Sequence, residues 1–116
     1  MIVNKSRHDY CLVRDLHPAF TFWRRLLGLM FRASLPVGSG LLIAPCQSVH
    51  TMHMRFPIDV VFLNKSWGVV GLERYLAPWR VSPTYRDSWF VLECPAGTID
   101  HSGTELGDRL ECTWKQ

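Results

Sequence analysis

The chain has 116 residues, of which 47% are hydrophobic and 20% are charged, with a formal net charge of +3. This balance indicates a folded chain rather than a disordered one, and the length fits one domain that spans residues 1–116. The longest apolar run, residues 26–31, is far shorter than the roughly 20 residues that cross a bilayer, so the sequence excludes a membrane-spanning helix.

The N-terminal segment and the cysteines indicate a soluble, cytoplasmic protein. Charged residues interrupt residues 1–15, so no apolar stretch typical of a secretion signal occurs there. The four cysteines are scattered and form no C-x-x-C pair, which favours reduced thiols over disulfides. The expected location is therefore the cytoplasm, without membrane contact.

Charge is distributed unevenly along the chain. Residues 1–36 contain six Lys and Arg against two Asp, whereas residues 91–116 contain two against five acids. The basic N-terminal third leaves nucleic-acid binding open as a weaker alternative. However, the sequence pI of about 8.8 is below the value of about 9 that is typical of nucleic-acid-binding domains, so nucleic acid is not the expected partner.

The first elements along the chain are two strands and a helix. Residues 2–5 and 10–14 mix β-branched, apolar and polar residues, and they are predicted to be strands that pair. Over residues 17–28, apolar side chains recur at helical spacing until Gly28, which is a suitable end. The sequence therefore predicts one short N-terminal helix.

From Gly38 onward, short apolar runs are separated by Gly, Pro, Asn and Ser, a pattern typical of an all-β sandwich or barrel. Further strands are expected at residues 41–44, 48–54, 58–63, 68–75, 88–94 and 109–114. The predicted fold class is mainly β, a small β-sandwich or barrel-like domain with one short N-terminal helix.

Three later segments carry more specific expectations. Residues 60–63 (VVFL) are apolar without alternation, which predicts that residues 58–63 form a central strand covered on both faces. Residues 64–66 are polar and predict a hairpin connection to the next strand. Thr98 is expected to cap a short helical turn over residues 99–101.

Four segments together resemble the domain-of-unknown-function family 192. They are residues 28–32 (GLMFR), 54–63 (MRFPIDVVFL), 91–98 (VLECPAGT) and 107–110 (GDRL). Their order and spacing carry the resemblance over about residues 10–113, which is most of the chain. The resemblance implies a compact, mainly β domain with a short N-terminal helix, and it brings no established activity with it.

A cluster of soft ligand types occurs at Cys46, His50, Met52 and Met54. If residues 48–54 are extended, the imidazole and both thioethers share one face, an arrangement suited to Cu(I). The second half expected of a zinc site is missing, and alternating methionines are more typical of a core. The sequence therefore predicts no metal and no cofactor, with these four residues as weak metal candidates.

Arg55 and Asp59 stand on either side of Pro57. Their side chains are expected to meet across this bend in a charge-assisted hydrogen bond. In the alternative interpretation, Asp59 acts as a base or ligand anchor beside His50. A carboxylate that enters an apolar strand needs a partner in either case.

The loop of residues 77–83 places Trp79 and Arg80 between two prolines. Loops restricted by proline are favoured sites for binding groups. The indole can stack on a planar ligand while the guanidinium pairs with an anion. The alternative is that Trp79 folds back and caps the core.

The sequence names no reaction and no catalytic residue. The expected function is a non-enzymatic accessory domain that binds a small anionic ligand or a protein partner. Its candidate binding surface is formed by His50, Arg55, Asp59, Trp79 and Arg80. The alternative is a small enzyme with a pocket centred on His50, Asp59 and Cys46. A closed pocket around His50, Asp59 and Arg80 would favour an enzyme, whereas an exposed Trp79 would favour a protein partner.

Overall fold

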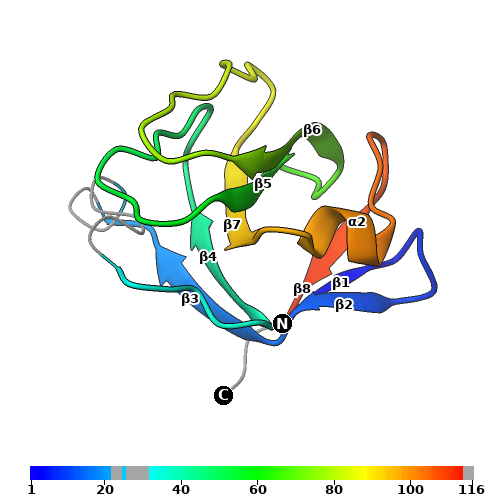
Figure 1. The fold of residues 1–116 in the computed structure, drawn as a ribbon. Helices are drawn as coiled ribbons and strands as arrows, with labels where there is room; N and C mark the ends of the chain where they lie inside the picture. The colour runs from blue at the N-terminus through cyan, green and yellow to red at the C-terminus, as the bar shows by residue number, and fades with distance from the viewer. Residues whose placement is uncertain (22–24, 26–31, 114–116) are drawn as a thin grey trace.

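Two β-sheets and a short helix form the fold of the computed structural model, which describes residues 1–21, 25 and 32–113 (Figure 1). The strands are β1 (Ile2–Asn4), β2 (Tyr10–Val13), β3 (Asp15–Ala19), β4 (Ser39–Ile43), β5 (Ile58–Leu63), β6 (Val69–Leu76), β7 (Phe90–Pro95) and β8 (Leu110–Cys112). The helix α2 (Thr98–Ser102) lies between β7 and β8 in the sequence. Within the described residues, no helix has the length and apolar character needed to span a membrane.

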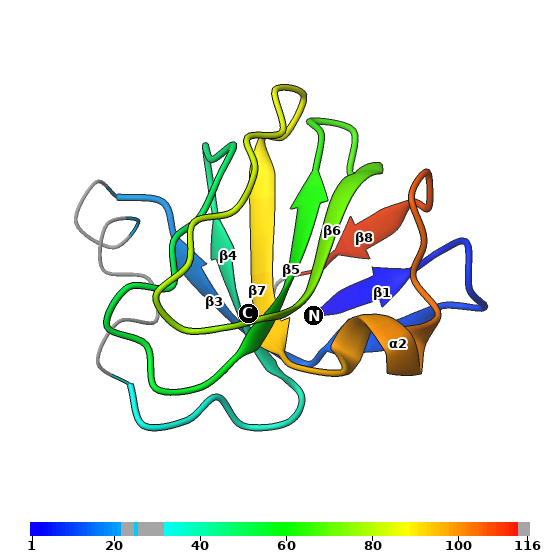
Figure 2. The same cartoon turned by 45° about the horizontal axis from the view of Figure 1, so that its top comes forward.

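The strands divide into a three-stranded sheet in the order β2-β1-β8 and a five-stranded sheet in the order β3-β4-β7-β5-β6. All pairings are antiparallel except that of β3 with β4, which is parallel. In Figure 2 the smaller sheet, with β1 and β8, lies to the right of β5 and β6. The predicted mainly β, sandwich-like fold is confirmed, and the described strands form two open sheets rather than a closed barrel.

Apolar side chains cover both faces of the larger sheet. One cluster lies between the two sheets and includes Val61 and Leu63 of β5. The other cluster lies on the opposite face and joins Val60 and Phe62 of β5 to side chains of the loops after β4 and β6. Successive side chains of a strand point to opposite faces, so one apolar run supplies both clusters. All of β5 is buried, which confirms the prediction for residues 58–63; β5 lies between β6 and the middle strand, β7.

The connection from β5 to β6 is the predicted hairpin. The Asn64 N–H donates to the carbonyl oxygen of Gly68 at 2.9 Å. Asn64 Oδ1 accepts from the N–H groups of Ser66 and Gly68, also at 2.9 Å. The asparagine side chain therefore closes the turn through local hydrogen bonds.

The predicted strand over residues 48–54 is wrong. Within it, only His50 forms a bridge, to Val81. Val49, Thr51 and Met54 are the buried residues, and this order breaks the period of two that a strand requires. The break occurs at a turn where His53 has a positive φ of 62°, so the segment is a loop.

The N-terminal strands pair as predicted, because β1 is antiparallel to β2. The predicted helix over residues 17–28 is wrong at its start, since residues 17–19 belong to β3 and pair with β4. β3 is an edge strand, where Pro18 is tolerated although proline has no N–H to donate. Arg25 has helical backbone and its N–H donates to Thr21 O at 2.9 Å. Residues 22–24 and 26–31 of the predicted helix lie outside the described residues.

The predicted cap of the helical turn is also wrong. Thr98 is the first residue of α2, and the capping position is taken by Gly97 with a φ of 98°. The Thr98 hydroxyl donates instead to Pro95 O at 2.7 Å. Glycine is suited to this position because residues that carry a side chain rarely adopt such a left-handed backbone conformation.

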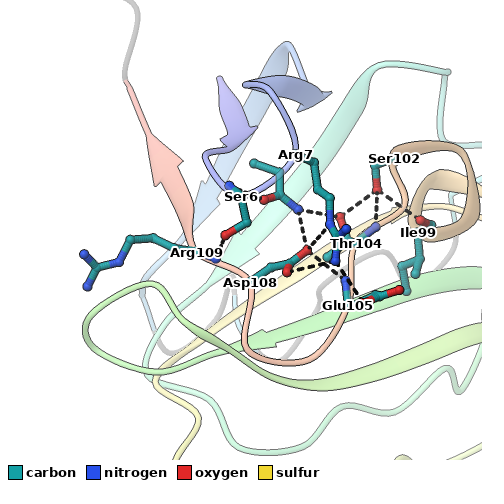
Figure 3. Close-up of polar contacts among 9 residues, drawn as sticks. Ser6, Arg7, Ile99, Ser102, Thr104, Glu105, Asp108 and Arg109 are labelled. Atoms are coloured by element: carbon teal, nitrogen blue, oxygen red, sulfur yellow. Dashed lines mark hydrogen bonds and ion pairs between the residues drawn. The ribbon is translucent and has the colours of Figure 1, made fainter.

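A polar network joins the turn after β1 to the turn before β8 (Figure 3). The Arg7 guanidinium donates to both carboxylate oxygens of Asp108, at 2.9 and 3.2 Å, and to Glu105 at 2.9 Å. The buried Asn4 donates to Asp108 and to Thr104, each at 3.1 Å. Burial by itself would raise the pKa of Asp108, but hydrogen bonds from Arg7, the Glu105 N–H and Asn4 lower it. The network therefore stabilises the fold above the ordinary aspartate pKa and loses this effect as the pH falls below it.

Candidate functional site

The candidate site residues lie mainly on two loops, residues 44–57 and 77–89, which cover the face of the larger sheet that points away from the smaller sheet. Thr51 joins these loops, and sequence reasoning missed it. Its N–H donates to Arg80 O at 2.8 Å, and its carbonyl accepts from the Trp79 N–H at 2.9 Å. Its hydroxyl donates to Ala77 O at 2.6 Å and accepts from the Arg80 N–H at 2.8 Å. One buried threonine therefore fixes the backbone beneath Trp79 and Arg80.

Trp79 stays at the surface instead of capping the core. Its side chain is 53% exposed, and its ring meets that of His53 edge-on, with centroids 4.6 Å apart. Both residues have left-handed backbone, with φ values of 63° and 62°. Residues other than glycine rarely adopt this conformation unless their surroundings impose it. The two rings are thus held in place by the loops that carry them.

The charged groups of this region are available to a partner. Arg55 and Arg80 are exposed, and neither guanidinium has a hydrogen bond or an ion pair with the residues that the structure describes. His50 is half-buried, and its Nδ1 accepts from the Met52 N–H at 3.2 Å. We call His50, Arg55, Trp79 and Arg80 the basic–aromatic surface.

Asp59 does not belong to this surface. It is fully buried, and Oδ1 accepts from the Tyr75 N–H at 2.9 Å. Oδ2 accepts from the N–H groups of Gly97 and Ile99 at 3.1 and 2.8 Å. These backbone donors take the place of the predicted partner, Arg55. Asp59 therefore anchors the β7–α2 turn to β5 and β6, and its oxygens are engaged in the core.

The four weak metal candidates, Cys46, His50, Met52 and Met54, differ in burial. Met54 is buried in the cluster below the loops, whereas Cys46 and Met52 are half-buried. The Cys46 thiol donates to Ser48 O at 2.9 Å. Burial raises the pKa of this thiol, and the Glu93 charge adds to the effect, against the opposing hydrogen bond to Ser48 and the charge of Arg25. Among the described residues, no group of three or more His, Cys, Asp or Glu has an arrangement that would hold a metal ion.

Glu93 is a buried acid that sequence reasoning missed. It is 2% exposed in the middle strand, β7, opposite Leu41 on one side and Val60 on the other. Its carboxyl group has no hydrogen bond or ion pair with any residue in the described part of the chain. Burial raises the pKa of Glu93 to about 8. The signal in the sequence is an acid within the apolar run of residues 90–94.

Comparison with known proteins agrees with the resemblance in the sequence. The model of the family DUF192, described as "Uncharacterized ACR", matches residues 3–112. The chain belongs to the DUF192 family. Two of the segments that carry the resemblance meet in the structure, because Asp59, in residues 54–63, accepts hydrogen bonds from Gly97 and Ile99, in and just after residues 91–98.

Curated relatives of this DUF192 chain carry the family name UPF0127. A UPF0127 protein of Pyrococcus furiosus is 41% identical over 98 residues, which cover 80% of this chain and 82% of the relative. One of Thermococcus sibiricus is 32% identical over 116 residues, which cover 96% of this chain and 73% of the relative. These names designate an uncharacterised family and bring no specific activity to the chain.

A solved structure shares the fold. It is a protein of unknown function from Novosphingobium aromaticivorans, with a TM-score of 0.76 and 23% identity. The match covers 84% of this DUF192 chain and 74% of that protein. The similarity extends the fold to a distant sequence and carries no function with it.

Proposed function

We propose that this DUF192 chain is a non-enzymatic binding module that recognises an acidic segment of a protein partner through its basic–aromatic surface. The observation that carries the proposal is the exposed Trp79, which precedes Arg80 in the chain and contacts the ring of His53, two residues before Arg55. Neither arginine side chain has a partner among the described residues. Exposed aromatic and arginine side chains are the types that contribute most to protein interfaces.

The hydrogen bonds that hold this surface in place favour binding over catalysis. Hydrogen bonds of Thr51 hold the Trp79–Arg80 backbone in advance, so little conformational entropy is lost when a partner binds. Carboxylates are the complementary groups, because the planar guanidinium donates two parallel hydrogen bonds to them. An enzyme centred on Asp59 and Cys46 is less well supported, since Asp59 is occupied by three backbone N–H groups and the Cys46 pKa is raised.

The test uses a short polyglutamate peptide as the probe and a polyglutamine peptide of equal length as its neutral control. Polyglutamate is expected to bind at low salt and to lose affinity as salt screens the charges. The double variant Arg55→Gln/Arg80→Gln is expected to bind about tenfold more weakly or worse, and Trp79→Ala is expected to weaken binding as well. Fluorescence anisotropy of the labelled peptide measures the affinity.

A matched control separates specific binding from general charge. The double variant Arg86→Gln/Arg109→Gln removes the same charge from two other exposed arginines and is expected to keep the affinity for polyglutamate within about twofold. Equal losses in the two double variants, or polyglutamine binding as tightly as polyglutamate, would contradict the proposal.

We infer further that the protein works in the cytoplasm. The inference is supported by four free cysteines, Cys11, Cys46, Cys94 and Cys112, because extracellular domains of this size commonly use disulfides. Thiol alkylation in intact cells, followed by mass spectrometry, is expected to find all four cysteines reduced. Recovery of the protein in an oxidised or exported fraction would contradict this location.

A further inference from the structure

A recess in the surface shares no residue with the basic–aromatic surface. It has a volume of about 320 Å³ and is bounded by β2, the turn before β4 and the turn from β7 into α2. The residues that line it are Tyr10, Cys11, Leu12, Arg14, Val37, Gly38, Pro95, Ala96, Gly97, Thr98 and His101. The recess therefore joins the edge of the smaller sheet to the end of the middle strand of the larger sheet.

Buried hydrogen bonds hold the walls of this recess. The turn from β7 into α2 is fixed by Asp59, which accepts from the Gly97 and Ile99 N–H groups. On the opposite wall, the Arg14 N–H donates to Gly38 O at 2.8 Å. Gly38 has a φ of 85°, a conformation suited to glycine. Both walls are thus present before a ligand enters, as is usual for small-molecule sites.

The chemistry of the recess favours an anion with an apolar part. Arg14 is exposed, and its guanidinium has no hydrogen bond or ion pair with the described residues. No Asp or Glu lines the recess to compete for it, while Leu12, Val37 and Pro95 supply apolar wall. His101 Nδ1 lies 2.8 Å from Gly97 O. Because a carbonyl oxygen only accepts, Nδ1 carries the proton in this contact.

We propose that this recess binds a small organic carboxylate, with the carboxylate on Arg14 and the apolar part of the ligand against Leu12 and Val37. A volume of about 320 Å³ is at the lower end of the range of ligand pockets, so the ligand is compact. A single guanidinium matches the two oxygens of a carboxylate. A phosphate site would usually add a cluster of free backbone N–H groups, and the Gly97 and Ile99 N–H groups are already bound to Asp59.

The experiment is an NMR titration of the isotope-labelled protein with benzoate, and with neutral benzamide and inorganic phosphate as comparisons. Benzoate is expected to shift the backbone amide signals of Gly38, Gly97 and His101 in a saturable way, at lower concentration than benzamide or phosphate. Arg14→Gln is expected to weaken benzoate binding about tenfold while leaving benzamide binding unchanged. Arg86→Gln, a change of equal charge at an exposed site outside the recess, is expected to leave the titration unchanged.

Three results would overturn the proposal. The first is that benzamide or phosphate binds as tightly as benzoate, because the carboxylate would then not be the recognised group. The second is an equal effect of Arg14→Gln and Arg86→Gln. The third is that benzoate shifts the amides of residues 50–55 and 79–81 instead of those that line the recess. The amide spectrum of each variant also shows directly whether its fold is retained.

Discussion

Replacing Glu93 by glutamine is expected to stabilise the protein above neutral pH. The carboxyl group is buried in the middle strand, and its pKa is raised from 4.5 to about 8 by burial. This shift corresponds to a cost of roughly 3 to 5 kcal/mol once the group is ionised in the folded state. A glutamine of the same shape stays neutral, so the free energy of unfolding of Glu93→Gln at pH 9 is expected to exceed that of the parent chain by an amount of this order.

The direction in which stability changes with pH follows from proton binding by Glu93. Between the unfolded pKa of about 4.5 and the folded pKa of about 8, the folded state keeps a proton that the unfolded state has lost. The free energy of unfolding is therefore not reduced by Glu93 below its unfolded-state pKa, and it falls as the pH rises from that value to the folded-state pKa. Asp108 acts at the acidic end of the pH range, because its lowered pKa makes the free energy of unfolding fall on acidification. Together these two groups favour a stability maximum in weakly acidic solution.

Urea denaturation at several pH values measures this effect. The control is Glu111→Gln, which removes an exposed glutamate of β8 and is expected to leave the slope of stability against pH unchanged. If Glu93→Gln has the same pH profile as the parent chain, or is less stable at every pH, then the Glu93 carboxylate is not the source of an alkaline loss of stability.

Asp59→Asn is expected to destabilise the fold by about 3 kcal/mol or more. The carboxylate accepts hydrogen bonds from three buried or partly buried backbone N–H groups through two oxygens. An asparagine places an NH₂ group where one oxygen was, and this group faces donors that it cannot pair with. At least one backbone N–H then loses its partner inside the protein.

Urea denaturation and amide hydrogen exchange check this prediction. The N–H groups of Gly97 and Ile99 are expected to exchange faster in Asp59→Asn, relative to amides in β4. Asp87→Asn makes the same chemical change at an exposed position and is expected to alter stability by less than about 0.5 kcal/mol. Similar stabilities for the two variants would show that Asp59 does not anchor the β7–α2 turn.

The sequence predicts the fold best where the pattern is local. The apolar run of residues 60–63 specifies a strand covered on both faces, and Asn64 closes the next turn through its own side chain. Residues 48–54 mislead, because alternating residue types suggest a strand while the turn at His53 breaks the alternation. Residues 17–19 mislead for another reason, because they stand at the start of the predicted helix but pair with β4 as a strand.

Local sequence pattern also predicts part of the candidate site. The prolines that flank Trp79 and Arg80 indicate a restricted, exposed loop, and both residues are exposed in the structure. The partners of Asp59 are not predictable in this way, because its donors lie 16 to 40 residues further along the chain. They are backbone groups, which leave no mark in the sequence. The sequence pattern therefore identifies candidate functional side chains, while the tertiary fold determines which of them are exposed.

The position of β1 constrains how the chain folds during synthesis. β1 pairs with β8, so Ile2 is opposite Cys112, and the smaller sheet stays incomplete until β8 has left the ribosome. Before then, β1 and β2 expose an unpaired strand edge and the apolar face that later packs on β5. Contacts between such distant parts of a chain form slowly, and exposed edges favour association. The nascent domain is therefore most accessible to chaperones, and most prone to aggregation, in the interval before β8 is synthesised.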